Sequence, residues 1–186
     1  HRVLRIGSAH DLLQRLPRVR RQTDLLFTIA EGWASRTREA WVPAICEVAR
    51  LPYVGSPPQA LTLALDKWVA KRVWQAEGLP VPWGVSLVRV EDVAGLGKLP
   101  FPLIVKPRYE GSGIGIDAAA IVHDRQQLTA RVAWAIAAFR QPVGVEEFIH
   151  GGEFTVCLVG DPLTALIPVQ RHIDPATTLS CHIVQK

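Results

Sequence analysis

An apolar run that ends in a lysine and leads into a glycine-rich segment is the feature that most limits what this chain can fold into. Residues Leu103–Lys106 are typical of a buried strand, and Pro107 follows it. The segment Glu110–Gly115 holds three glycines, which let backbone N–H groups approach an anion closely. It lacks the GK[ST] signature of a P-loop, and no helix is expected at its end, as a dinucleotide-binding fingerprint requires. We therefore expect a loop between two strands that closes over phosphates, with an ordinary hairpin turn as the alternative.

Two lysines four positions apart mark an earlier helix. Lys67 and Lys71 follow Asp66 within a helical stretch that we predict from about Pro58 to Glu77. A spacing of four places both lysines on one helix face. The pair either presents ammonium groups to an anion or belongs to an ordinary solvated face.

Acidic residues flank a short Gly-Gly turn later in the chain. The turn joins two strand-like runs, Val143–Phe148 and Glu153–Gly160, so Glu146 and Glu153 lie at two points along one crossing. The backbone between them can hydrogen-bond an adenine edge, and a carboxylate can accept ribose hydroxyls. The alternative is a hairpin that carries acidic residues at its ends.

The composition excludes several classes of protein. With 48% hydrophobic and 20% charged residues, the 186-residue chain is long and apolar enough to bury a core. No apolar run approaches the roughly 18 residues of a membrane span, so we expect no membrane partner. The net charge of +4 owes much to arginines near one end, typical of a solvated helix end: Arg15, Arg18, Arg20 and Arg21. Because no basic stripe is interleaved with aromatic residues, we expect no nucleic-acid partner.

The order of the predicted elements indicates an α/β piece followed by an α+β unit with largely antiparallel strands. The apolar run Asp24–Ala30 predicts a buried parallel strand, and Arg38–Arg50 has a helical period before a turn at residues 52–56. A further helix is expected from Asp124 to about Arg140. The remaining strand-like runs are Trp83–Val88, Leu103–Lys106, Val143–Phe148, Glu153–Gly160 and Leu163–Val169.

These segments, taken in order, resemble a known nucleotide site. The chain reads Leu65-Asp66-Lys67, then Pro102–Pro107, then Glu110–Gly115, then Val145–Val156. This order is similar to LDK…K, PLIVKP…EGSSxG and VEEF(I/L)xGxEFTV in the D-alanine–D-alanine ligases of the ATP-grasp superfamily. The segments Asp24–Gly32 and Arg38–Ala44 are similar to those before the LPYVGS turn of that family. The resemblance extends from about residue 3 to about residue 170.

The resemblance implies an ATP-grasp fold that is incomplete at the C-terminus. Residues 1–57 would be the remnant of an N-terminal α/β domain, 58–145 the central ATP-grasp subdomain, and 146–186 the start of the C-terminal subdomain. The implied activity is an ATP-dependent carboxylate–amine ligase that joins two D-alanines through an acylphosphate for peptidoglycan precursors. It implies ATP and Mg²⁺ as cofactors and a cytoplasmic location, which three cysteines without CxxC spacing also favour. A homodimer is one assembly to expect.

The resemblance also assigns roles to single residues. Lys67 and Lys106 are implied to contact the ATP phosphates. Ser112 is implied to cover them and to help organise the second substrate, and the Glu39 carboxylate to hold the active-site arrangement near the amino acid. The other implied nucleotide contacts are Glu110, Gly111 and Gly113 in the loop, Glu146, Glu147, Phe148 and Ile149 in an adenine hinge, and Glu153 on the ribose.

The chain departs from the family pattern at several points. Gly113 stands where a second loop serine is usual, and Thr28 stands where asparagine is common. The glycine-rich loop for the first substrate, the arginine for acyl transfer, and the Asp, Glu and Asn that bind magnesium do not appear. Since the chain also begins without Met, we expect both ends to be incomplete, with the metal ligands beyond Lys186. Asp161 and Asp174 are interpreted as loop residues.

Three interpretations follow from these departures. The first is a fragment of a D-alanine–D-alanine ligase, for which we expect the 186 residues alone to be inactive. The second is an ATP-grasp ligase of another amino acid or peptide substrate. The third is a truncated, non-catalytic nucleotide-binding protein, which a longer gene carrying the magnesium ligands would exclude.

Overall fold

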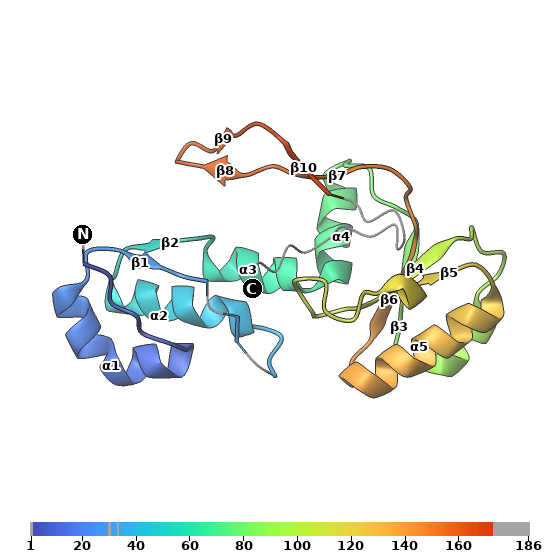
Figure 1. The fold of residues 1–186 in the computed structure, drawn as a ribbon, viewed down its shortest axis with the longest axis horizontal. Coiled ribbons are helices and arrows are strands. Elements are labelled where there is room, and N and C mark those ends of the chain that lie inside the picture. The colour runs from blue at the N-terminus through green and yellow to red at the C-terminus, as the bar shows by residue number, and fades with distance from the viewer. Residues whose placement is uncertain (1, 30, 33, 173–186) are drawn as a thin grey trace. The chain divides into compact units, whose positions relative to one another are not determined.

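The chain divides into two compact units, His1–Pro80 and Val81–Lys186. The computed structural model describes residues 2–29, 31–32 and 34–172, and each unit is considered by itself (Figure 1). Within these residues no helix combines the length and the apolar character that a membrane crossing needs. The expected subdomain boundaries after residues 57 and 145 stay predictions.

The first unit is built on a short pair of parallel strands with two helices beside it (Figure 1). Strand β1 (Leu26–Phe27) pairs in parallel with β2 (Tyr53–Val54), which confirms a parallel strand within 24–30. Residues 53–54 were expected in a turn, and that expectation is wrong, because the apolar Tyr53 and Val54 supply the partner strand. Helices α1 (Ala9–Gln22) and α2 (Trp41–Ala49) enclose its core with these strands. The buried core residues are Leu12, Val19, Leu26, Val42, Cys46, Ala49 and Leu51.

The predicted helix from Pro58 to Glu77 is two helices, so this prediction is wrong at its centre. Helix α3 (Pro58–Leu65) ends before Asp66, and α4 (Lys67–Ala76) begins directly after it. Asp66 has extended backbone angles, and its carboxylate accepts the N–H groups of Trp68 and Val69 at 3.1 Å. An aspartate in that position caps a helix start, so the same residue ends one helix and begins the next.

The second unit centres on a four-stranded sheet in the order β3-β6-β4-β5. Its strands are β3 (Gly84–Leu87), β4 (Leu103–Pro107), β5 (Ile121–Val122) and β6 (Val143–Glu147). Every neighbouring pair in this sheet is antiparallel. This confirms the predicted antiparallel α+β unit and the loop between two strands.

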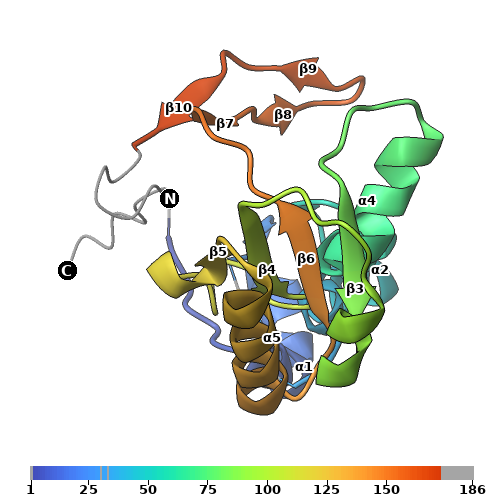
Figure 2. The same ribbon diagram turned by 90° about the vertical axis from the view of Figure 1, so that its right-hand side faces the viewer.

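Helix α5 (Arg125–Phe139) covers one face of this sheet (Figure 2). Asp124 caps it by accepting the N–H of Gln127 at 2.8 Å, as the sequence predicted. Alternate residues of β4 and β6 point toward α5, among them Leu103, Val105, Val143 and Val145, each 0% exposed. They pack against Leu128, Val132 and Ala135 of the helix. Burial of these side chains is the main favourable term for this unit.

The last described strands form two short pairs where two longer strands were expected. Strand β7 (Glu153–Thr155) pairs with β10 (Val169–Arg171), and β8 (Leu158–Val159) pairs with β9 (Thr164–Ala165), all antiparallel. The predicted runs 153–160 and 163–169 are therefore each broken. Pro168 lies between β9 and β10 and has no N–H for a ladder hydrogen bond. The pairing also shifts by one residue between the two pairs, as a bulge requires.

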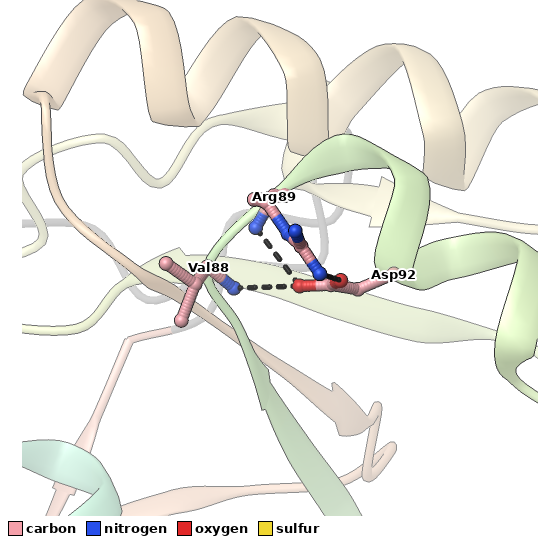
Figure 3. Close-up of polar contacts among 3 residues, drawn as sticks. All are labelled: Val88, Arg89 and Asp92. Carbon is pink, nitrogen blue, oxygen red and sulfur yellow. Dashed lines mark hydrogen bonds and ion pairs between the residues drawn. The ribbon is translucent and has the colours of Figure 1, made fainter.

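A carboxylate fixes the connection that leaves β3. The 3₁₀ helix η2 (Val90–Gly95) follows the strand, and Asp92 within it accepts the N–H groups of Val88 and Arg89 at 3.3 and 3.0 Å (Figure 3). The Arg89 guanidinium adds an ion pair at 3.1 Å. The pKa of Asp92 is lowered, first by the hydrogen bond from the Arg89 backbone, against a smaller opposing effect of desolvation.

The depressed pKa of Asp92 predicts a dependence of stability on pH. Its contribution is present above the usual aspartate pKa and is lost as pH falls through the lowered folded-state value. Asp92→Asn should therefore lower the urea midpoint at pH 7, and the difference from the unmodified protein should shrink below about pH 4. Urea unfolding between pH 7 and pH 2.5 measures both curves. Parallel curves over that range would contradict the assignment.

Candidate nucleotide-binding site

The sheet face opposite α5 carries two charged side chains of the second unit. Because side chains alternate along a strand, Lys106 of β4 and Glu146 of β6 lie on the face that Leu103, Val105, Val143 and Val145 do not use. Their neighbours on that face are small residues and Ile104. Across the strands Gly144 is the partner of Lys106 and Ser86, and Gly84 is the partner of Glu146.

Lys106 and Glu146 form an ion pair on that face. The ammonium Nζ donates to Glu146 Oε2 at 2.8 Å, and the two side chains are 26% and 15% exposed. In the strand register Ile104 pairs with Glu146 and Lys106 with Gly144, so the two charges are diagonal neighbours. The sequence placed both residues in one site, and the structure brings them together. Lys106 is thus held at a fixed position at the end of β4.

The glycine-rich segment 110–115 folds as two successive turns after β4. The N–H of Ile114 donates to the Gly111 carbonyl and the N–H of Ile116 to the Gly113 carbonyl, each at 3.0 Å. Ser112, Gly113 and Gly115 have φ of 51°, 73° and 78°. A serine in this left-handed region is unusual, and such residues cluster at functional sites. Ser112 is exposed at the tip of the loop.

The start of the loop is held from the segment that follows α5. Glu110 is partly buried, and its Oε1 accepts the Nε2 of Gln141 at 2.7 Å. Glu110 is thus a carboxylate of fixed orientation at the entry to the loop. The sequence identified Glu110 but not its partner.

The expected adenine hinge follows β6. The N–H of Glu147 donates to the Trp83 carbonyl at 2.9 Å, and that of Phe148 to the Pro102 carbonyl at 3.0 Å. Both hydrogen bonds tie the hinge to the ends of β3 and β4. The Phe148 ring meets His150 edge-on at 4.9 Å, and Ile149 is 66% exposed. These two N–H groups therefore already form hydrogen bonds within the protein.

Glu153 lies in the first short strand after the hinge. Its carboxylate pairs with Arg171 Nη1 at 3.0 Å across the β7–β10 pair, and the two side chains are 47% and 31% exposed. The sequence predicted Glu153 as a ribose contact but did not identify Arg171. The cross-strand register alone brings these two residues together.

The remaining predicted residues belong to the first unit. Lys67 is the first residue of α4 and is partly buried, and Glu39 lies partly buried in the 3₁₀ helix η1 (Arg38–Ala40). Lys71 is only 3% exposed. The alternative of a solvated face is therefore wrong for Lys71, because its side chain is buried in the fold.

A metal site is not apparent in the part of the chain that the structure describes, where no three His, Cys, Asp or Glu side chains gather. Asp161 lies in a turn between β8 and β9, as interpreted from the sequence. Asp174 lies outside the described residues. The expectation that the magnesium ligands lie beyond Lys186 stays a prediction.

Solved structures share this fold over most of the chain. The VanG D-Ala:D-Ser ligase from Enterococcus faecalis aligns with a TM-score of 0.68 and 26% identity over 84% of this chain and 45% of that chain. A D-alanine–D-alanine ligase from Bacillus anthracis, solved in complex with ATP, aligns with a TM-score of 0.66 and 21% identity over 91% of this chain and 54% of that chain. The chain is therefore an ATP-grasp protein, as the sequence predicted.

Sequence comparison identifies the family. A family profile described as "D-ala D-ala ligase C-terminus" matches residues 73–178, more than half of the chain. The D-alanine–D-alanine ligase of Pseudomonas entomophila (strain L48) is 40% identical over 159 residues, which cover 84% of this chain. The chain belongs to the D-alanine–D-alanine ligase family. It spans about half the length of that relative, at 47%.

Two residues near the loop were not predicted from the sequence. Arg131 of α5 is 8% exposed and donates to the Gly115 carbonyl at 2.8 Å, and Gln141 bonds Glu110. Arg131 is a charged residue on the buried stripe of a helix, with Leu128, Val132 and Ala135 close in sequence. A charge inside an apolar stripe is the signal that would have found Arg131, since buried charges are paired. Gln141 carries no such signal.

The Lys106–Glu146 pair predicts a measurable coupling energy. A partly buried charged hydrogen bond should give about 1 kcal/mol in a double-mutant cycle of Lys106→Met and Glu146→Gln, followed by urea unfolding. The Arg89–Asp92 pair is the matched control, because Arg89 is 75% exposed. Its coupling should be lower, since exposed pairs are screened by water. Equal coupling in the two cycles would contradict a fixed Lys106.

Proposed function

We propose that the full-length protein is an ATP-dependent carboxylate–amine ligase that joins two D-alanine molecules, with Mg²⁺ as the metal. One observation carries the proposal. In a chain of this family, a strand-end lysine and a glutamate are paired at 2.8 Å on the sheet face opposite α5, in the strand pair that leads into a glycine-rich turn. Fixed charge beside a loop of backbone N–H groups suits a nucleotide triphosphate.

The chemistry is a two-step transfer. A carboxylate oxygen of the first D-alanine attacks the γ-phosphorus of ATP, and ADP leaves, which gives an acylphosphate. The amine of the second D-alanine then attacks the acyl carbon, phosphate leaves with the bonding pair, and the amine loses a proton. The protein contributes positioning and charge neutralisation, the main effects in phosphoryl transfer.

The residues of this chain divide these tasks between them. Lys106 neutralises charge on the phosphates, and Ser112 at the loop tip covers them. Lys67 is proposed for the same task on the family motif alone. Glu110, Gly111 and Gly113 shape that loop. Glu146, Glu147, Phe148 and Ile149 line the adenine. The N–H groups of Glu147 and Phe148 already form hydrogen bonds within the protein. The hinge carbonyls and Ile149 would therefore contact the adenine edge. Glu39 acts near the amino-acid substrate.

A different second substrate is the competing proposal. The VanG structure, 26% identical over 84% of this chain, is a D-Ala:D-Ser ligase. A hydroxymethyl side chain in place of a methyl requires a polar partner near the second substrate. We also propose a cytoplasmic location, where ATP is available, and assembly as a homodimer.

The proposal predicts a phosphate-releasing reaction. The full-length protein with ATP and Mg²⁺ should release phosphate only when D-alanine is added. Replacing part of the D-alanine with D-serine tests the competing proposal, in which D-serine is the second substrate. Lys106→Ala and Lys67→Ala should each weaken ATP binding by about 1.5–3 kcal/mol, the range for a charged hydrogen bond. Lys98→Ala removes an equal charge at an exposed position and should change nothing. Phosphate assay and calorimetry measure these effects.

Two results would count against it. Absence of turnover despite tight ATP binding would favour a non-catalytic nucleotide-binding protein. Unchanged ATP affinity in both lysine variants would remove their assignment to the phosphates.

Glu153 predicts a preference for ribose over deoxyribose. A carboxylate that accepts both ribose hydroxyls should make 2′-deoxyATP bind more weakly than ATP, by about three- to tenfold for one hydrogen bond. Glu153→Gln should reduce this preference, and Arg171→Met should reduce it less, because Arg171 holds the carboxylate without contacting the sugar. Competition binding measures all three. Equal binding of the two nucleotides by the unmodified protein would leave Glu153 with its strand-pairing role alone.

A further inference from the structure

The entry to the glycine-rich loop is fixed by one amide side chain. Gln141 Oε1 accepts the backbone N–H of Tyr109 at 2.6 Å, and Gln141 Nε2 donates to Glu110 Oε1 at 2.7 Å. One residue earlier, the N–H of Arg108 donates to the Pro142 carbonyl at 3.1 Å. Gln141 thus continues the β4–β6 pairing by side chain beyond the last paired residues, Pro107 and Val143.

These two partners require opposite hydrogen-bonding groups. The Tyr109 N–H needs an acceptor, and the Glu110 carboxylate needs a donor. A glutamine offers both from one planar group of the right length. Glutamate cannot donate when ionised, and lysine and arginine cannot accept. The position therefore requires a side chain, such as an amide, that both donates and accepts.

The exit from the loop is fixed by a second side chain. Arg131 donates from Nη2 to the Gly115 carbonyl at 2.8 Å and pairs with Asp117 at 3.0 Å, with its guanidinium 3.9 Å from the centre of the Trp134 ring. Gly115 itself has no room for a side chain. A Cβ there would meet Pro107 Cγ at 2.6 Å and the Phe139 ring at 2.8 Å. The loop exit is thus packed directly on the end of β4 and on α5.

We infer that Gln141 and Arg131 are positioning residues for the nucleotide phosphates, since together they anchor both ends of the loop that covers them. The inference rests on the proposed nucleotide function. The loop tip lies between these two anchored segments, 109–110 and 115–117. Ser112 at that tip is exposed and Ile114 is 44% exposed. Neither anchor contacts the nucleotide in this proposal; each acts through the loop.

A swap of the two entry groups tests the anchor. Gln141→Glu places two carboxylates together, and Glu110→Gln places two amides together. The double variant Gln141→Glu/Glu110→Gln restores both hydrogen bonds and the net charge, because the new carboxylate would accept from the Tyr109 N–H and from the new amide. Gln126→Glu, at an exposed position of α5, is the control for added negative charge. Affinities for ATP and for AMP are measured on the full-length protein, with Tm recorded for every variant.

The expected result is a selective loss of phosphate binding. Gln141→Glu should weaken ATP binding about tenfold, through the loss of one charged hydrogen bond. Glu110→Gln should weaken it less, because the amide oxygen at position 110 can still accept from Gln141 Nε2. AMP, which lacks the β- and γ-phosphates, should change less than twofold and so reports an intact fold. The double variant should recover ATP affinity to within about threefold, and Gln126→Glu should match the unmodified protein.

Three outcomes overturn the inference, and they differ from failure of the proposed function. An unchanged ratio of ATP to AMP affinity in Gln141→Glu would do so. So would a double variant that recovers Tm without ATP affinity. Arg131→Met should also lower the ATP to AMP ratio, and a lower Tm with an intact ratio would reduce Arg131 to a structural residue. Equal affinity of the unmodified protein for ATP and AMP would instead refute the phosphate site itself.

Discussion

The packing of α5 on one face of the four-stranded sheet is the constraint on which the second unit depends. Leu103, Val105, Val143 and Val145 turn toward the helix and are completely buried. The two-residue period of a strand then sends the intervening side chains to the other face, whatever their chemistry. Lys106 and Glu146 meet there for this reason. A one-residue slip of β6 against β4 would bury the charge and expose the valines.

The same helix has a second task. Beside its apolar stripe, α5 provides Arg131, and the segment that follows the helix provides Gln141; these two side chains bond the two ends of the glycine-rich loop. One element thus stabilises the sheet and sets the geometry of the loop beside it. A substitution on α5 can therefore affect ligand binding without touching the ligand.

Much of this arrangement could be predicted from the sequence, because the determinants are local. An apolar run ending in Lys106, glycines at fixed spacing and a capping Asp124 each act within a few residues. The break at Asp66 was missed although its signal is also local, because an aspartate inside an amphipathic stretch is compatible with one continuous helix. The one-residue shift near Pro168 depends on which strand faces which. Pairs such as Lys106–Glu146 and Glu153–Arg171 depend on register, which a single sequence does not specify.

The strand order has a consequence for the growing chain on the ribosome. In the sheet, β3 has β6 as its neighbour, and β4, β5 and α5 are all made between them. During N-to-C synthesis β3 has no strand to pair with until β6 has been made. The β4–β5 pair can already form before that. Closing the sheet is therefore a late, non-local event, of the kind that slows folding. Until β6 is made, the unpaired edge of β3 can form hydrogen bonds with an incorrect strand.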